Sequence, residues 1–312
     1  MCGYRKILRS YYQSKGGGLL RFELLEEDHI NVKKNTYFYD FDDGRAEGMI
    51  QKIMETRQFP SLDELVIGYW GYSWEDGCQP IIDDIVANAD KFSHIQKLFI
   101  GNMDYESCEV SWITQGDYSK IWAAMPQLKE LTIKGSMDLV LGDNICHEEL
   151  EALTIICGGL PKYVIESIQK AKFPKLKKLL LFIGIEDYGF DGDADTIKEL
   201  LEKANFPELT YLGITDSEIQ DELTEVVLNS KFMGQISTLD LSNGTISDKG
   251  GALILEKISD YPNIEKLDLH HNYFSDEMVK KLEALSVEVD VSEQEEADED
   301  GDEVYTYPVL TE

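Results

Sequence analysis

The sequence predicts an α/β solenoid in which about eight strand–helix repeats stack side by side, with a parallel, concave sheet and convex helices. Two observations predict this fold. A short pattern, hydrophobic-x-x-Leu-x-hydrophobic, recurs eight times along the 312 residues. Apolar residues spaced three and four apart, as helices require, lie between its copies. Because one such unit cannot bury its apolar side alone, the units are expected to share one continuous core.

The repeated pattern is that of leucine-rich repeats, L-x-x-L-x-L-x-x-N-x-L. The copy that begins at Ile264 extends furthest, through Leu267 and Leu269 to Asn272 and Phe274. Spacings near 28 residues with helical connectors are typical of the ribonuclease-inhibitor-like horseshoe. The leading residues of the eight copies are Leu62, Ile95, Leu128, Leu150, Leu176, Leu209, Ile236 and Ile264.

Three segments are predicted along the chain. Residues 1–58 form an N-terminal arm with capping strands ("GLLRFELL", "TYFYDFDD") and a helix ("AEGMIQKIMETRQF"). Residues 59–292 form the leucine-rich repeat solenoid, which ends in a last strand within "VEVDVSE". Residues 293–312 form an acidic C-terminal tail, because "EQEEADEDGDE" carries too much like charge to pack. The apolar "VYTYPVL" that follows is expected to dock back onto the last repeats.

The composition excludes several classes of partner and compartment. The formal net charge is −31, which repels phosphate backbones and anionic lipid, so neither nucleic acid nor a membrane is an expected partner. Five cysteines without a CxxC pair indicate reduced thiols in a large chain. No apolar run is long enough to cross a bilayer. We therefore expect an acidic cytoplasmic protein.

The repeat pattern also predicts a binding face. Side chains alternate along a strand, so the residue between the two core positions and the residue two places later lie on the concave side. This places an apolar group in the middle of the face and an acidic group at its C-terminal end. The predicted apolar group is Ile156, Leu180, Phe182 and Tyr211, and the predicted acidic group is Asp240, Asp268, His270 and Asp290.

The acidic group has three interpretations. Asp240 and Asp268 occupy the same position in neighbouring repeats, and Asp290 joins them if the last strand is in register. Carboxylates about 4.8 Å apart raise one another's pKa or require a cation. The group is a solvated acidic strip, a contact for basic groups of a partner, or a site for a divalent ion. His271, next to His270, is expected to point away from the face.

Long loops that follow the strands carry a second set of candidates. Aromatic residues beside carboxylates in loops on a rigid scaffold are a common form of recognition surface, although each ring can instead fill a gap between repeats. These rings belong to Trp70, Tyr72, Trp74, Tyr105, Trp112, Tyr118, Trp122, Tyr188 and Phe190. The rim candidates among them are Trp70, Trp74, Tyr105, Trp112 and Tyr188.

Catalytic and cofactor motifs are absent from the sequence, so no catalytic residue, resident metal or cofactor is assigned and the chain is not expected to be an enzyme. The stretch "DGDADTIKELLE" places carboxylates as a calcium-binding EF-hand loop does. Its sixth position, however, is Thr196 where the loop needs Gly. Carboxylates at the start of a helix explain the stretch better.

Several stretches resemble a family of bacterial cytoplasmic leucine-rich repeat proteins. They are "GNMDYESCEVSWITQGDYS", "GGLP", "DYGF", "LDLS", "LDLHHN" and "VEVDVSEQEEADED", and they span the chain from about Gly68 onward. The first 35 residues differ from that family's usual start. The resemblance implies a protein without assigned activity, whose gene neighbours encode radical-type and ATP-grasp-type modifying enzymes. It thus implies a scaffold in a modification or biosynthetic pathway.

These observations together predict a non-catalytic scaffold for protein–protein interaction. A protein or peptide would contact the apolar group and the aromatic rim, and its basic groups would meet the aspartates. One alternative is a cation-dependent protein or enzyme that uses Asp240, Asp268, His270 and Asp290. Another is a structural subunit whose face binds a second copy.

Overall fold

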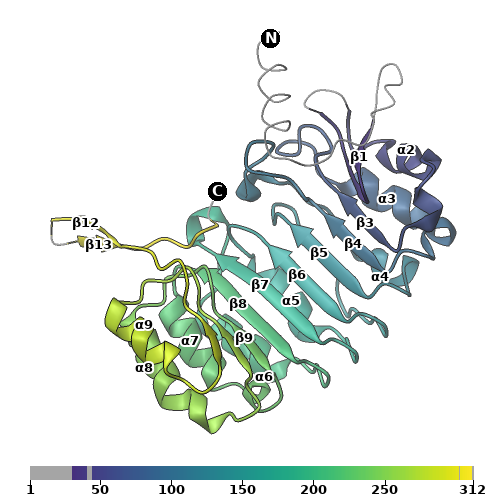
Figure 1. Cartoon of the computed structure of the whole chain (residues 1–312). Coiled ribbons are helices and arrows are strands. Elements are labelled where there is room, and N and C mark those ends of the chain that lie inside the picture. Colours follow the sequence, from purple (N-terminus) through teal and green to yellow (C-terminus); the bar gives the residue numbers. More distant parts are fainter. Residues whose placement is uncertain (1–29, 41–43, 302, 311–312) are drawn as a thin grey trace.

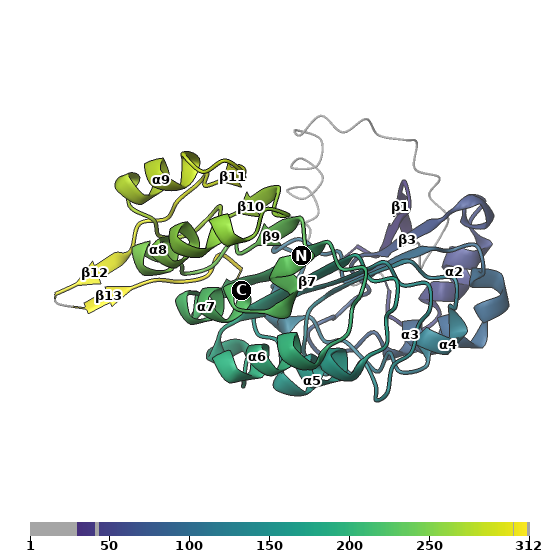
Figure 2. The same ribbon diagram turned by 90° about the horizontal axis from the view of Figure 1, so that it is seen from below.

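The computed structural model describes residues 30–40, 44–301 and 303–310. One sheet of eleven strands follows chain order from β1 to β11, and a separate two-stranded hairpin lies near the end of the chain. β1 and β2 are antiparallel, whereas every later pair in the large sheet is parallel. Figure 1 shows the strands side by side, and Figure 2 shows helices α2 to α7 packed behind one face of the sheet.

From β2 to β11, strands and helices alternate along the chain as the repeat pattern predicts, except that β5 leads to β6 without a helix. The strands are β1 (Asn31–Lys33), β2 (Thr36–Phe38), β3 (Glu64–Ile67), β4 (Lys97–Ile100), β5 (Glu130–Lys134), β6 (Ala152–Ile156), β7 (Lys178–Gly184), β8 (Tyr211–Ser217), β9 (Thr238–Asp240), β10 (Lys266–Asp268), β11 (Glu288–Asp290), β12 (Asp298–Asp300) and β13 (Glu303–Tyr305). The helices are α2 (Met49–Glu55), α3 (Gln79–Ala87), α4 (Ile121–Ala124), α5 (Lys162–Lys170), α6 (Ala194–Lys203), α7 (Gln220–Leu228), α8 (Asp248–Lys257) and α9 (Asp276–Glu283).

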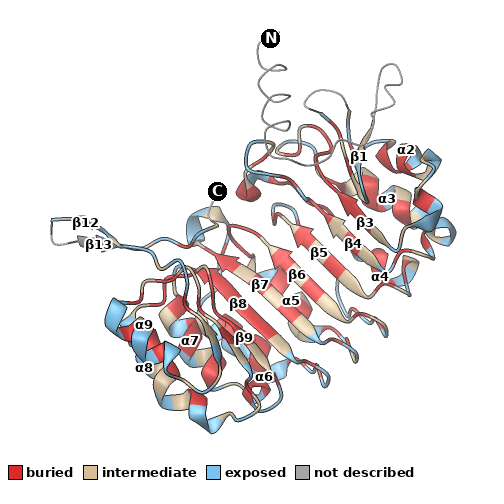
Figure 3. Cartoon of the chain, viewed as in Figure 1, coloured by how far each residue is buried: buried red, intermediate tan, exposed pale blue. Residues whose placement is uncertain are grey.

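The core runs continuously between the sheet and the helices. Strand positions alternate between buried and half-buried residues in β5 and β6, so one face of the sheet is packed and the other is accessible. The buried positions are the repeated leucines and isoleucines, such as Leu131 and Leu153, which pair in register across the two strands. Figure 3 shows this alternation along the strands. We call the accessible side the open face.

Aromatic rings form a ladder on the helix side of the core. The rings of Phe173 and Phe206 stack at 6.2 Å, and those of Phe206 and Phe232 stack at 6.1 Å. Trp122 contacts Phe173 at 5.5 Å at the other end of this row. The aromatic residue that precedes several copies of the pattern is therefore a packing element between repeats, since ring pairs at this distance add to the stability of apolar burial.

Side-chain amides join each of several repeats to the one before it. Gln127, Gln235 and Asn263 immediately precede a leading hydrophobic residue, and each donates its amide N–H groups to two carbonyl oxygens of the preceding repeat. These bonds satisfy buried carbonyls where the chain turns into the strand. Polar residues at that position are therefore structural, which the repeat pattern alone did not reveal.

Two carboxylates of the EF-hand-like stretch accept hydrogen bonds from backbone N–H groups at the starts of helices. Asp193 accepts a hydrogen bond from the Thr196 N–H at 2.8 Å and caps α6, as the sequence predicts. Asp191 accepts the Lys162 N–H at 2.6 Å, at the first residue of α5 in the preceding repeat. Both carboxylates therefore serve the positive ends of helices.

The predicted end elements fall partly within the described residues. "TYFYDFDD" contains β2, "AEGMIQKIMETRQF" contains α2, and "VEVDVSE" contains β11. The strand expected in "GLLRFELL" lies outside the described residues. The three-segment division of the chain stays a prediction.

The acidic tail contains more structure than its charge predicted. Strands β12 and β13 form a hairpin, here called the arm, that projects away from the repeats (Figure 1). Beyond it, Leu310 N–H donates to Asp216 Oδ1 at 2.8 Å and Val309 N–H donates to the Asn243 carbonyl at 3.0 Å. The expected docking of "VYTYPVL" onto the last repeats is confirmed for its final residues.

Candidate functional site

The open face carries one unbroken row of paired residues across nine strands. The row begins at Val66 on β3 and continues through the central strands to β11. Every predicted position pairs with the next, so the register read from the repeats is confirmed. The row is Val66, Phe99, Thr132, Thr154, Leu180, Gly213, Asp240, Asp268 and Asp290.

The apolar middle of the open face lies on β6, β7 and β8. Ile156, Leu180 and Phe182 are half-buried, as expected for side chains that stand on an accessible sheet face. Gly213 on β8 leaves room for Leu180, because a Cβ built at Gly213 would lie 2.3 Å from Leu180 Cδ1. The glycine therefore allows the leucine side chain to extend over the neighbouring strand.

Tyr211 joins the apolar middle to the acidic end. Its hydroxyl donates to Asp240 Oδ2 at 2.5 Å. Burial, followed by the neighbouring Asp240 carboxylate, raises the pKa of the Tyr211 hydroxyl, which therefore stays protonated as a donor. The Lys178 ammonium lies 4.5 Å from the centre of the Tyr211 ring. Lys178 is thus a residue of the face that the sequence analysis missed, although its position before the core leucine of β7 places it on this side.

The three aspartates of the acidic end share one local geometry. Asp240 Oδ1 accepts the Ser242 hydroxyl at 2.6 Å, and Asp290 Oδ1 accepts the Ser292 hydroxyl at 2.6 Å. Asp268 has His270 in the equivalent place, with 2.5 Å between His270 Nδ1 and Asp268 Oδ1. Each carboxylate therefore has a hydrogen-bonding side chain two residues later, which lowers the need for an external ion.

Partners within the chain stabilise the charged form of these carboxylates. Hydrogen bonds from the Ser292 side chain and backbone lower the pKa of the Asp290 carboxyl. Lys266, one residue row away, lies 3.9 Å from carboxylate oxygens of both Asp268 and Glu288. Asp240 is only 5% exposed, whereas Asp268 and Asp290 are half-buried. Ligands therefore have better access to the last two carboxylates.

A trio of side chains at this end has the composition of a metal site. Asp268, His270 and Asp290 each offer one ligand atom, and the three atoms lie within 4.8 Å of one another. His271 has left-handed backbone, with φ +50°, and its ring bonds to Glu293 and Glu295. His271 therefore has a different set of partners from the trio. Its ring nevertheless contacts the His270 ring edge to face at 5.3 Å, so it does not point away from its neighbour as expected.

The rim candidates separate into buried and accessible rings. Trp70 is fully buried, which contradicts its prediction as a binding residue, because its ring fills the core and Nε1 donates to the Asp76 carbonyl. Trp74 and Tyr188 are half-buried, and Trp74 stacks on Tyr69 at 6.4 Å. Tyr105 and Trp112 are 60% and 50% exposed. The other long-loop rings that turn out to be buried are Tyr118, Trp122 and Phe190.

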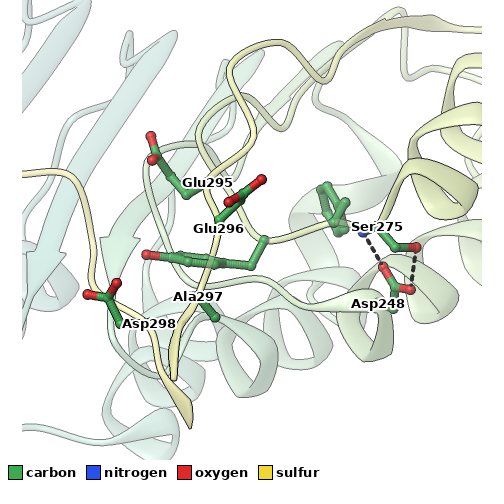
Figure 4. A pocket seen from close by; sticks show the side chains of 8 residues that line it. Asp248, Ser275, Glu295, Glu296, Ala297 and Asp298 are labelled. Atoms are coloured by element: carbon green, nitrogen blue, oxygen red, sulfur yellow. Dashed lines mark hydrogen bonds between the residues drawn. The ribbon is translucent and has the colours of Figure 1, made fainter. Parts of the chain in front are cut away.

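A shallow cleft lies at the base of the arm, apart from the predicted face. Its wall includes the carboxylates of Glu295, Glu296 and Asp298 and the side chain of Tyr273. Figure 4 shows these carboxylates on one side of the pocket and Ser275 with Asp248, which accepts hydrogen bonds from it, on the other side. The repeat pattern could not indicate this cleft, because four of its residues, Glu295 to Asp298, follow the last repeat.

Among solved structures, the chain is similar to a Bacteroides fragilis protein whose crystal structure was a Northeast Structural Genomics Consortium target. The two share 36% sequence identity with a TM-score of 0.81, over 99% of this chain and 85% of that chain. The chain belongs to the family of that protein. The family therefore adopts this stack of repeats, and the leucine-rich repeat type of fold is supported. The ribonuclease-inhibitor-like class stays a prediction.

A weaker similarity is to the internalin InlF of Listeria monocytogenes, at 14% identity and a TM-score of 0.26 over 77% of this chain and 76% of that chain. A score this low carries no argument about function. No family model and no curated protein matches the chain. Within the described residues, every helix is too short or too polar to span a membrane.

Proposed function

We propose that the chain is a non-catalytic scaffold that binds a protein or peptide on the open face of its sheet. The observation that supports this most is the order of side chains along the single paired row. In this row Leu180 is an accessible apolar residue, and the carboxylates of Asp268 and Asp290 follow on later strands. Phe182 and Tyr211 lie two residues to either side of the row on β7 and β8. A partner with an apolar segment next to basic residues matches this order.

The rigidity of the face favours binding over catalysis. The strands are tied to one another by parallel pairing and by amide bonds between repeats, so side chains of the face are held in place before a partner arrives. Preorganisation of this kind reduces the entropy lost on association. Tyr105 and Trp112, in the loop that follows β4, would extend the contact beyond the sheet.

The compartment and the pathway remain part of the proposal. Cys78, Cys108, Cys146 and Cys157 are all free thiols in the described chain, as a reducing cytoplasm would maintain them. A scaffold for a modifying enzyme would present its substrate on the open face and leave the chemistry to that enzyme.

A pull-down from lysate of a related bacterium tests the binding face. The Leu180→Glu, Phe182→Glu double variant places two charges in the apolar middle and should lose a partner that wild type recovers. The control is Val140→Glu, Tyr163→Glu, which adds the same charge at exposed residues off the row. Equal recovery by wild type and both variants, with mass spectrometry as the readout, would refute the assignment of the face.

The trio of Asp268, His270 and Asp290 favours a second candidate function, a cation-dependent one. Carboxylates and imidazole are both ligand types that Zn²⁺ accepts, and a site with three protein ligands leaves a fourth position for water or substrate. An ion would compete with the present hydrogen bond between His270 and Asp268. Titration with ZnCl₂ should then show one bound ion per chain, lost in His270→Ala and kept in Asp298→Ala. Absence of binding at millimolar Zn²⁺ rejects this candidate.

A further inference from the structure

The segment Tyr307–Leu310, here called the tail segment, lies across the loops at the carboxyl ends of three strands. Leu310 N–H donates to Asp216 Oδ1 at the end of β8, and Val309 N–H donates to the Asn243 carbonyl after β9. After β10, the Tyr273 hydroxyl accepts the Tyr307 N–H at 3.0 Å and donates to the Tyr307 carbonyl at 2.9 Å. The contacts therefore recognise an extended backbone.

The side chains of the tail segment contribute much less to this contact. Tyr307 and Val309 are 55% and 46% exposed, whereas Pro308 between them is buried. We call the surface formed by Asp216, Asn243 and Tyr273 under the tail segment the groove. In the docked segment Pro308 is buried and Leu310 is half-buried, while Tyr307 and Val309 stay accessible. Backbone recognition with one buried side chain is how proteins commonly bind extended peptides.

The groove belongs to the repeats and does not depend on the tail segment for its shape. Asp216 and Asn243 both have left-handed backbone, with φ +57° and +60°. Asp216 N–H donates to the Ser242 carbonyl at 3.1 Å, and Asn243 N–H donates to the His270 carbonyl at 2.9 Å. The two acceptors that meet the tail segment are therefore fixed by neighbouring repeats, as a preformed receptor requires.

Asp216 is the part of the groove that most needs a ligand. Its side chain is fully buried, and within the described residues Oδ2 has no hydrogen-bond partner. Burial raises the pKa of the Asp216 carboxyl, and the backbone N–H groups of Leu310 and Val309 oppose that shift. Asp216 Oδ1 is therefore available as an acceptor for an extended peptide that supplies the N–H of Leu310.

The connection to the tail segment is suited to release. The arm that leads to it pairs only three residues on each strand, and an isolated hairpin of this size is marginal in water. Figures 1 and 2 show the arm projecting from the repeats. The sequence between residues 293 and 303 is strongly acidic, and the rest of the chain has the same sign of charge. Repulsion therefore opposes docking and weakens with salt.

We propose that the groove of Asp216, Asn243 and Tyr273 is a docking site for an extended, proline-containing peptide, and that its resident occupant is the chain's own tail segment, held in a releasable intramolecular contact. This site is distinct from the open face, so the proposal does not depend on the binding function proposed above. A peptide of the same chemistry gains access only when the tail segment leaves.

The experiment uses the full chain and a fluorescein-labelled peptide with the sequence of Val304 to Leu310. The Val309→Pro chain lacks the N–H that donates to Asn243, so its own tail segment is released. Val309→Ala keeps that N–H and is the matched control. The tethered segment competes at an effective concentration on the order of millimolar. Fluorescence anisotropy should therefore show at least tenfold tighter peptide binding to Val309→Pro than to wild type or Val309→Ala.

A second substitution and a second peptide identify the groove. Asp216→Gly adopts left-handed backbone without strain and removes the Oδ1 acceptor of the Leu310 N–H. Added to Val309→Pro, it should weaken peptide binding about tenfold. The labelled peptide with Pro in place of Val309 should bind no variant. Equal affinity of the Val309→Pro and Val309→Ala chains for the first peptide, or no effect of Asp216→Gly, overturns the proposal.

Two measurements on the wild-type chain test docking of the tail segment even if a variant fails to fold. Hydrogen exchange should find the amides of Val309 and Leu310 protected, and Tyr273→Phe should speed their exchange. Exchange at the unfolded rate in wild type overturns the proposal. Light scattering should give a monomer. A wild-type dimer that becomes monomeric in Val309→Pro would place the tail segment in a second copy and overturn intramolecular occupancy.

Discussion

Replacing Asn272 by alanine should destabilise the fold by about 4 kcal/mol. Asn272 is fully buried; its Oδ1 accepts the Ile246 N–H at 3.0 Å, and its Nδ2 donates to the Leu241 and Leu269 carbonyls at 3.1 Å. Alanine removes the acceptor of a buried N–H and the donor to the Leu241 carbonyl. Each buried group left without its partner costs about 1–3 kcal/mol. The Leu269 carbonyl keeps a second donor, Gln294.

Gln294 supplies the matched control for this prediction. It repeats the role of Asn272 one repeat later, because Oε1 accepts the Phe274 N–H at 3.1 Å and Nε2 donates to the Leu269 and Val291 carbonyls. Gln294 is half-buried, so water can replace its bonds and Gln294→Ala should cost about 1 kcal/mol.

Urea unfolding followed by circular dichroism measures both changes from the shift in midpoint at an unchanged m-value. A loss below about 1 kcal/mol for Asn272→Ala, or equal losses for the two variants, would refute the argument from buried hydrogen bonds.

Three further outcomes follow from single contacts. Gly213→Ala should lower stability by about 1–3 kcal/mol through overpacking, because the new Cβ would lie 2.3 Å from Leu180 Cδ1; a melting temperature equal to wild type contradicts this. Ser292→Ala should cost about 1 kcal/mol at most at pH 7 and nothing at pH 2. Ser292 lowers the pKa of the Asp290 carboxyl. Its contribution to stability is therefore present above the unfolded-state pKa of about 3.9 and is lost as pH falls through the folded-state pKa. An equal loss of stability at both pH values contradicts this. Cys146 is exposed while the other described thiols are buried, so Cys146→Ser should remove one fast equivalent in a thiol-reagent assay at pH 8.

The sheet could be predicted from the sequence because every repeat must bury the same few hydrophobic residues. A hydrophobic residue, a Leu and another hydrophobic residue each need burial in every repeat, so alignment of the copies aligned Asp240 with Asp268 and Asp290. Period-two alternation then fixed which side chains lie on the open face. The same reasoning failed at His271, because this residue follows β10 and has left-handed backbone, and its ring contacts that of His270.

Residues outside the repeated positions were predicted less well for a physical reason. Trp70 and Trp112 both lie beside carboxylates in long loops, so the sequence does not distinguish them. In the structure the Trp70 ring is buried and the Trp112 ring is half exposed. Their difference depends on the path of each loop over its neighbours, which no local period records. The amide bonds of Gln235 and the groove at Asp216 likewise join residues from different repeats. Only the three-dimensional stack brings these partners together.

Because the amide bonds between repeats are the same in successive repeats, the number of repeats could change without loss of these bonds. Gln235 and Asn263 stand at the same point of successive repeats and bind the same two carbonyl positions of the repeat before. If residues 236–263 were duplicated, the repeat before the copy would receive the same amide donors as it does now. The repeat after the copy would find the same two carbonyl acceptors. A relative could therefore gain or lose one whole repeat here without a new interface. Because residues 236–263 contain Asp240, such a change would lengthen or shorten the acidic end by one aspartate.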